Sequence, residues 1–279
     1  MQPPGKADMV FTDLDGTLLD HHTYSWQMAR PGLKIIQQKQ IPLIFTTSKT
    51  LAEAGKLQGE MGIHHPIIFE NGSGIAAPEA YFREFPTDRQ WGEFRVWLLG
   101  PDYPAILNTL KELRQKYGYR FRGFSDCSDE EVAQLTGLSV EMAQLARQRC
   151  SSEPILWEDK DKKWILFAEQ LSRRGLRLVR GGRFWHVLGN QTGKGRAARL
   201  LKSVYQQNWP HLNWRTIGIG DSPNDLELLQ VVDVPVLVQR PDGQYIPVPQ
   251  AIAVIKPPGI GPEGWKWAII HLFESKNNR

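Results

Sequence analysis

The sequence predicts an α/β protein, with a Rossmann-like core built on a parallel sheet and an inserted α+β domain. Short apolar segments alternate with amphipathic segments in the first 80 residues, and the alternation returns after residue 190. This pattern is typical of parallel strands joined by helices. Between the two parts, aromatic residues, Arg and hairpin-like pieces favour a separate unit. We therefore expect a core at 1–82 and 188–279, interrupted by an insertion at 83–187.

The core elements follow from apolar runs and the residues that flank them. Pro31 suits the first turn of a helix, and Gly62 suits the end of one. Before the insertion, the sequence predicts strands at 9–13, 41–47 and 66–72 and helices at 30–40 and 50–62. After the insertion, it predicts helices at 192–209 and 222–232 and strands at 215–221, 234–238 and 251–255.

Inside the insertion, the main signals are helix caps and aromatic hairpin patterns. Ser128 and Glu131 have the spacing of a capping box, and Ser139 is a second candidate N-cap. We expect a helix after each of these serines and a third helix at 161–175. The expected hairpin strands are at 81–86, 119–124 and 181–189.

Composition is that of an ordinary globular protein. Hydrophobic residues make up 41% of the chain and charged residues 23%, so a sizeable core can form. No apolar run approaches the ~20 residues of a bilayer span, and we expect no signal peptide. Two cysteines are too few for a disulfide framework or a cysteine-rich zinc site. These features predict a cytoplasmic protein with free thiols.

Two aspartates follow the first predicted strand. Asp13 and Asp15 are spaced i, i+2, so an extended segment directs both carboxylates to one side. They lie at the carboxyl edge of a parallel sheet, where open α/β folds bind ligands. Gly16 and Thr17 then turn the chain, and backbone N–H groups there can face an anion. The spacing alone leaves a helix cap or a polar turn equally open.

A second acidic pair follows a later strand. Ser222 and Asp225 form a capping box by themselves, which explains Asp225 without any function, but Asp221 is not needed for that cap. Carboxylates at two neighbouring strand ends repel one another, and a divalent cation would relieve this repulsion. Oxygen ligands of this kind favour Mg²⁺.

Two polar segments suit an anion beside these carboxylates. Thr47 and Ser48 end the second predicted strand, where hydroxyl and N–H groups either bind phosphate oxygens or only cap the next helix. Lys194 lies in the first turn of a predicted helix, where the macrodipole disfavours a cation. A residue that breaks a local rule without a packing gain is often functional. We expect Lys194 to neutralise a phosphate or to orient an aspartate.

The order of these motifs resembles that of the haloacid dehalogenase superfamily of phosphotransferases. The motifs are D-x-D-G-T at 13–17, T-T-S-K at 46–49, Lys194 at a helix start and G-D-S-P-N-D at 220–225. The insertion resembles the large α/β caps of that superfamily. Over nearly the whole chain, the sequence is similar to mannosyl-3-phosphoglycerate phosphatases, in segments such as FENGSGI, GLSVEMAQLARQRCSSEP, GGRFWHVLG and PGIGPEGW. A relative acting on the glucosyl substrate would look much the same.

The resemblance implies a Mg²⁺-dependent phosphoric monoester hydrolase of compatible-solute (mannosylglycerate) synthesis. Its substrate would be mannosyl-3-phosphoglycerate or glucosyl-3-phosphoglycerate, cleaved through an aspartyl-phosphate. Asp13 would be the nucleophile, and Asp15 would be first the general acid and then the base. The implied metal ligands are Asp13, the Asp15 backbone carbonyl and Asp221, supported by Asp225. The implied phosphate-binding residues are Thr47, Ser48, Lys194 and Asn224, with Asn71 nearby.

The core motifs explain only the phosphate, so the cap must recognise the rest of this substrate. Arg suits bidentate contact with a carboxylate, and we expect Arg149, Ser151 and Arg183 to face the substrate. Arg149 ends a predicted helix, where the dipole also favours a cation. The expected partner is a small phosphorylated sugar-glycerate, with no nucleic acid or membrane, and the chain would be a monomer or dimer.

Two other kinds of function stay open on the sequence alone. A sucrose-phosphatase-like enzyme, a general hexose phosphatase or a phosphomutase of the same superfamily would carry the same core motifs. A basic nucleic-acid-binding protein would use the Arg-rich stretch at 172–183, which is more simply a solvated face. The net charge of +4 is weak support for it, and it leaves the acidic strand ends unexplained.

Overall fold

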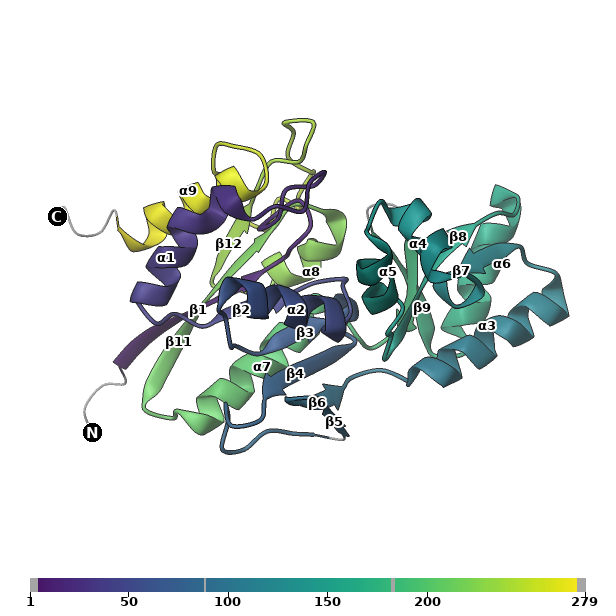
Figure 1. Cartoon of the computed structure of the whole chain (residues 1–279), viewed down its shortest axis with the longest axis horizontal. Helices are drawn as coiled ribbons and strands as arrows, with labels where there is room; N and C mark the ends of the chain where they lie inside the picture. The colour runs from purple at the N-terminus through teal and green to yellow at the C-terminus, as the bar shows by residue number, and fades with distance from the viewer. Residues whose placement is uncertain (1–4, 88, 182–183, 275–279) are drawn as a thin grey trace.

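Two β-sheets, one of eight strands and one of four, form the framework of the protein. The structure, a computed structural model, describes residues 5–87, 89–181 and 184–274. Figure 1 shows two units side by side, the larger one carrying β1 and the smaller one carrying β7 to β10. The α/β class predicted from the sequence is confirmed. No described helix is both long enough and apolar enough to cross a bilayer.

The larger sheet has the strand order β12-β11-β1-β2-β3-β4-β6-β5. The first five of these strands are parallel, and the last three extend the sheet in antiparallel fashion. Because β1 lies between β11 and β2, its carboxyl end opens at the middle of the parallel part. The bounds are β1 (Gly5–Thr12), β2 (Leu43–Thr46), β3 (Ile67–Phe69), β4 (Gly74–Pro78), β5 (Arg89–Trp91), β6 (Phe94–Leu98), β11 (Leu212–Gly220) and β12 (Val234–Leu237).

Strands β5 and β6 pair within the larger sheet, although they lie in the range 83–187 that was expected for the insertion. The segment 81–86, expected as a hairpin strand, forms turns instead. Its Phe82 packs edge-on against Tyr205, with ring centroids 5.0 Å apart. The aromatic residues at the start of the expected insertion therefore cover the core sheet, whereas later ones form the core of the cap. Similarly, 251–255 forms no strand and makes only an isolated bridge, between Val236 and Ile255.

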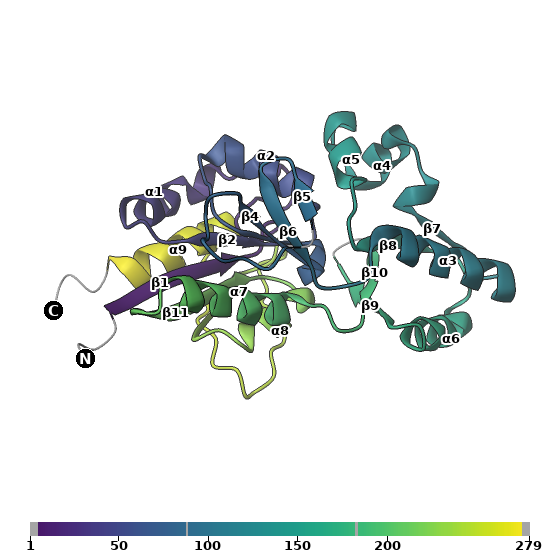
Figure 2. The ribbon, with the colours of Figure 1, turned by 90° about the horizontal axis from the view of Figure 1, so that it is seen from below.

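Helices cover both faces of the larger sheet (Figure 2). One face carries α1 (Arg30–Gln38), α2 (Leu51–Met61) and α9 (Pro262–Phe273), and the other carries α7 (Lys194–Asn208) and α8 (Leu226–Leu229). As predicted, Gly62 ends α2 in the left-handed conformation, with φ of 65°. Three short 3₁₀ turns complete this unit: η1 (Gln27–Ala29), η2 (Glu70–Gly72) and η4 (Pro223–Asp225).

The smaller sheet belongs to the inserted cap and has the antiparallel order β7-β8-β10-β9. Its strands are β7 (Phe121–Gly123), β8 (Ser152–Trp157), β9 (Leu176–Arg180) and β10 (Trp185–Gly189). Ser128 and Ser139 cap two helices, as predicted. A 15-residue helix, α3, was not expected from the sequence. The remaining elements are α3 (Tyr103–Tyr117), η3 (Phe124–Asp126), α4 (Asp129–Thr136), α5 (Val140–Ala146) and α6 (Asp161–Ser172).

Trp265 of α9 supports the carboxyl end of β1. Its side chain is fully buried, and its indole N–H donates to Thr12 Oγ1 at 3.0 Å. A Cβ on Gly32 of α1 would lie 2.8 Å from the indole ring, so α1 and α9 pack at close range only with glycine there. This one side chain therefore ties two helices to the strand that carries Asp13.

The substitution Trp265→Ala should lower the free energy of unfolding by about 3–5 kcal/mol, because it opens a large cavity in the core. Trp267 is the matched control, since it lies on the same helix with 36% of its side chain exposed. Trp267→Ala should cost at most about 1 kcal/mol. Urea denaturation measures both, and equal losses would contradict a specific buttress at Trp265.

Candidate active site

Asp13 directly follows the central strand β1. Its backbone N–H donates to the carbonyl of Ile219 on β11, which holds it at the sheet edge, and it is 5% exposed. Leu14 is fully buried, whereas Asp15 lines the same cleft as Asp13. Gly16 then turns the chain with φ of 81°, and a Cβ there would come within 3.0 Å of an Asp221 carboxylate oxygen. The turn therefore requires glycine in order to bring Asp221 close to the first motif.

Lys194 is the first residue of α7 and is 1% exposed. Its ammonium group lies 2.7 Å from Asp13 Oδ1 and 2.6 Å from Asp225 Oδ1. Burial by itself lowers the pKa of Lys194, but the carboxylates of Asp13 and Asp225 raise it above its usual value. Lys194 is therefore an ammonium ion that joins two acidic motifs, which accounts for a cation at the unfavourable end of a helix.

Asp225 holds the loop after β11 in shape. Its Oδ2 accepts hydrogen bonds at 3.1 Å from the backbone N–H groups of both Asp221 and Ser222. The predicted capping box of Ser222 and Asp225 is confirmed, and the same carboxylate also contacts Lys194. Asp221 Oδ1 accepts from the hydroxyl of Thr17 at 2.9 Å, so the two strand ends are directly connected.

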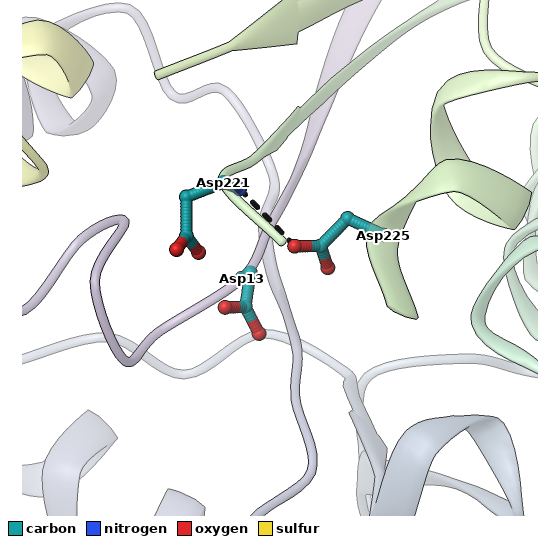
Figure 3. A group of neighbouring side chains, drawn as sticks. All are labelled: Asp13, Asp221 and Asp225. Atoms are coloured by element: carbon teal, nitrogen blue, oxygen red, sulfur yellow. Dashed lines mark hydrogen bonds between the residues drawn. The ribbon is translucent and has the colours of Figure 1, made fainter. Parts of the chain in front are cut away.

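The carboxylates of Asp13, Asp221 and Asp225 gather in one buried cluster (Figure 3). One oxygen from each lies within 4.8 Å of the others. Burial first, and then the charge of Asp225, raise the pKa of Asp13 well above its usual value, although Lys194 lowers it. Burial and Asp225 likewise raise the pKa of Asp221 to about 7. These three buried carboxylates share the charge of one ammonium group, that of Lys194. The cluster therefore has an excess of negative charge.

A divalent metal ion fits this cluster. The donors are all carboxylate oxygens, which hard cations prefer, and no thiol or imidazole belongs to the group among the described residues. A dication would balance the two carboxylates that Lys194 does not neutralise. Asp225 already accepts from two N–H groups and from Lys194, so Asp13 and Asp221 are the better direct ligands.

Asp15 is held by a cation that sequence analysis did not assign to the site. Lys49 Nζ lies 2.9 Å from Asp15 Oδ1 and 3.8 Å from Glu53 Oε1. The Lys49 side chain is 7% exposed and the Asp15 side chain 34%. Burial lowers the pKa of Lys49, but the charges of Asp15 and then Glu53 raise it above its usual value. The carboxylate of Asp15 is therefore aimed into the cleft by a permanently charged neighbour.

The predicted phosphate-binding residues lie around these carboxylates in different ways. Thr47 is buried, and its hydroxyl oxygen accepts from the N–H of Lys49 at 3.1 Å, which shapes the start of α2. Ser48 and Asn224 both line the cleft. The Asn224 amide donates to Asn71 Oδ1 at 3.0 Å, so the loops after β3 and β11 meet here.

A cleft of about 550 Å³ lies between the core and the cap, with Asp13 and Asp15 in its wall. Arg149 lines it from the cap, but Nε donates to the carbonyl of Ala146, and Nη1 donates to the carbonyl of Ser48 in the core. Ser151 is fully buried, and its hydroxyl donates to the carbonyl of Pro101, away from the cleft lining. Arg183 lies outside the described residues.

Glu70 of η2 lies in the core and hydrogen-bonds to the cap. Its carboxylate accepts from the backbone N–H groups of Cys150 and Ser151, at 2.7 and 3.0 Å, and from the hydroxyl of Ser152 at 2.7 Å. The side chain is fully buried, and burial raises its pKa, against the opposing effects of Arg149 and these hydrogen bonds. This contact fixes the segment that leads from α5 into β8 relative to the core.

Comparison with known proteins agrees with this site. Residues 10–87 match the family model described as haloacid dehalogenase-like hydrolase. A glucosyl-3-phosphoglycerate/mannosyl-3-phosphoglycerate phosphatase from Methanococcoides burtonii is 41% identical over 97% of this chain and 98% of its own. The chain belongs to this phosphatase family. A protein of the same name from Persephonella marina is 37% identical over 95% of this chain and 98% of its own.

Solved structures share the fold of this phosphatase family member at low sequence identity. Thermoplasma acidophilum 0175 has a TM-score of 0.67 and 16% identity, covering 96% of this chain and 99% of that one. The sucrose-phosphatase from Synechocystis sp. has a TM-score of 0.60 and 16% identity, covering 95% of this chain and 98% of that one. These likenesses confirm the haloacid dehalogenase-like fold predicted from the motifs.

Three site residues of the phosphatase were missed or left without a role by sequence analysis. Thr17 and Lys49 stand in the motifs D-x-D-G-T and T-T-S-K, so their positions offered a signal. Their partners, Asp221 and Asp15, lie far from them along the chain. Glu70 stands beside Asn71 in FENGSGI without any sign that it faces the cap. Only the packing of η2 against the cap segment reveals its role.

Removing the central cation should be costly. Lys194→Met leaves Asp13 and Asp225 facing one another in a buried site, and we expect a loss of about 3–5 kcal/mol in the free energy of unfolding. Lys202→Met is the control on the same helix, because Lys202 is 38% exposed and pairs with Asp233 at 3.2 Å. It should change stability by at most about 1 kcal/mol. Chemical denaturation near neutral pH compares them, and matching losses would count against the buried ion cluster as a major contributor.

Proposed function

We propose that the protein hydrolyses the phosphate ester of mannosyl-3-phosphoglycerate or glucosyl-3-phosphoglycerate, releasing the sugar glycerate and phosphate. The family supports a phosphatase, and relatives at 37–41% identity over nearly the whole chain carry both substrates in their names. The observation that carries the proposal is a buried set of charged residues beside a cleft between the core and the cap. The set consists of Asp13, Lys194, Asp221 and Asp225.

Asp13 acts as the nucleophile in the first step. Its carboxylate attacks phosphorus, a bond forms from Asp13 to phosphorus, and the bond from phosphorus to the glycerate oxygen breaks. Asp15 donates its proton to the departing oxygen, so the sugar glycerate leaves as a neutral alcohol at that position. Lys194 on Asp13 Oδ1 favours the charged form that this attack requires.

Asp15 acts as the base in the second step. It takes a proton from a water molecule, the water oxygen attacks phosphorus, and the bond from phosphorus to Asp13 breaks. Phosphate leaves, and Asp13 regains its carboxylate. The ion pair with Lys49 keeps Asp15 in the cleft wall through both steps, because Lys49 is itself held by Glu53. Thr47, Ser48, Asn224 and Lys194 surround the transferring phosphoryl group.

Mg²⁺ is the divalent cation that we propose for the acidic cluster. Asp13, the backbone carbonyl of Asp15 and Asp221 would hold it, with Asp225 in support. Bound there, it supplies positive charge that reduces repulsion between the phosphate and the carboxylates. The enzyme would act in compatible-solute synthesis, and both described cysteines are buried free thiols, in keeping with a cytoplasmic location.

Phosphate release from mannosyl-3-phosphoglycerate and glucosyl-3-phosphoglycerate, with Mg²⁺ and with excess EDTA, tests this function. We expect turnover of one or both with Mg²⁺ and almost none with EDTA. Asp13→Asn should lower kcat by about a thousandfold or more, because the amide cannot form the phosphoryl intermediate. Circular dichroism of this variant checks its fold, and full activity of a folded Asp13→Asn protein would refute the nucleophile assignment.

Lys49→Met tests whether Lys49 positions the general acid. The leaving alcohol of a sugar-glycerate ester needs a proton, whereas 4-nitrophenolate leaves without one. We expect kcat/KM, which reports the step in which the alcohol leaves, to fall about 10- to 100-fold on the natural ester but less than about threefold on 4-nitrophenyl phosphate, since general acid catalysis supplies roughly 10²- to 10⁴-fold. Lys56→Met is the control, because Lys56 lies on α2 just after Lys49 in the sequence and its side chain is 39% exposed. A parallel fall on both esters would show that Lys49 acts on phosphate binding instead.

A further inference from the structure

His186 occupies the central strand of the cap sheet and faces the substrate cleft. In β10 it pairs with Pro154 on β8 and with Val179 on β9. Its neighbours Trp185 and Val187 point the other way, into the cluster formed with Phe167 of α6. The alternation of strand residues therefore directs His186 out of the cap core. Both His186 and Pro154 line the 550 Å³ cleft that contains Asp13 and Asp15.

One ring nitrogen of His186, Nδ1, has no hydrogen-bond partner in the described part of the chain. Its side chain is only 6% exposed, and Nδ1 is buried and unpartnered. Gly181 packs closely against the other edge of the ring, because a Cβ there would lie 2.8 Å from Nε2. A buried imidazole nitrogen without a partner is unfavourable for folding alone and calls for a ligand that supplies the missing hydrogen bond.

The surroundings of His186 keep its ring uncharged. Burial, followed by the positive charges of Arg149 and Lys194, lowers its pKa to about 3. A neutral imidazole offers one N–H donor and one acceptor nitrogen. This pair of groups matches a hydroxyl, which also donates and accepts. The cations of the cap wall, Arg149 and Arg180, are better suited to the carboxylate of the substrate.

We propose that His186 hydrogen-bonds to a hydroxyl of the sugar ring and is a specificity-determining residue of the cap. The inference rests on the proposed function, because the sugar is the part of that substrate that its phosphate and carboxylate partners leave unrecognised. The pairing with Pro154 places a flat apolar surface beside the imidazole, an arrangement that suits one face of a sugar ring. His186 contributes nothing to phosphoryl transfer itself.

The test compares substrates with and without the sugar. For His186→Phe and His186→Gln, kcat/KM is measured on mannosyl-3-phosphoglycerate, on glucosyl-3-phosphoglycerate and on 3-phosphoglycerate. We expect His186→Phe to lose about 10- to 100-fold on the better glycosyl substrate and less than about twofold on 3-phosphoglycerate. His186→Gln should lose less on the glycosyl substrate, because its amide also donates and accepts. The melting temperature of His186→Phe should not fall, since an unpartnered polar ring is replaced by an apolar one.

His65→Phe is the matched control. His65 is another uncharged histidine, whose pKa burial lowers to about 4, but its Nδ1 accepts from the backbone N–H of Leu43. This substitution should lower the melting temperature and leave the ratio between substrates unchanged.

Three results would overturn the proposal. These are an equal loss on all three substrates, no loss on the glycosyl substrates, or a fall in stability that accounts for the loss. Failure of the proposed function has a different signature. In that case the unmodified protein would release phosphate from neither glycosyl substrate, while 4-nitrophenyl phosphate is still hydrolysed.

Discussion

One buried ammonium group organises the catalytic end of the sheet. Lys194 joins carboxylates that follow β1 and β11, so α7 must begin where both can reach its first residue. Close backbone packing makes this start possible, since a Cβ on Gly72 would lie 2.3 Å from the carbonyl carbon of Gly193. Burial and the helix dipole both oppose a cation here, and the two carboxylates offset them. The geometry of the site and its stability therefore depend on the same contacts.

The turn after β3 connects this centre to the cap. Glu70 and Asn71 both have a left-handed backbone, with φ of 49° and 56°, which is uncommon outside glycine. The strained turn sends Glu70 to the backbone of the cap segment and Asn71 to Asn224, which lines the same cleft as Asp13. Strain of this kind is retained where the surrounding contacts depend on it. The position of the cap and the shape of the cleft near Asn224 thus depend on two adjacent residues.

The sequence predicted that the core site residues lie close together, because they stand at strand ends and helix starts. Asp13, Asp221 and Lys194 violate local preferences there, and a parallel sheet brings such positions to one edge. It did not predict that β5 and β6 extend the core sheet. An antiparallel hairpin rich in aromatic residues has the same sequence pattern whether it pairs with the core or lies in the cap. The sequence also predicted that Ser151 faces the substrate. Its hydroxyl instead donates to the carbonyl of Pro101, between β6 and α3.

Side chains of the cap cannot be assigned by residue type, because the backbone competes with the substrate for their hydrogen bonds. Arg149 lines the cleft, yet two of its nitrogens are occupied by carbonyls, one of them in the core. Its charge still acts on the cleft, because it adds to burial in lowering the pKa of His186. Arg149 therefore favours an anionic substrate while it holds the cap in place. Neutral groups must then recognise an uncharged sugar, and His186 faces the cleft with its Nδ1 unpaired among the described residues.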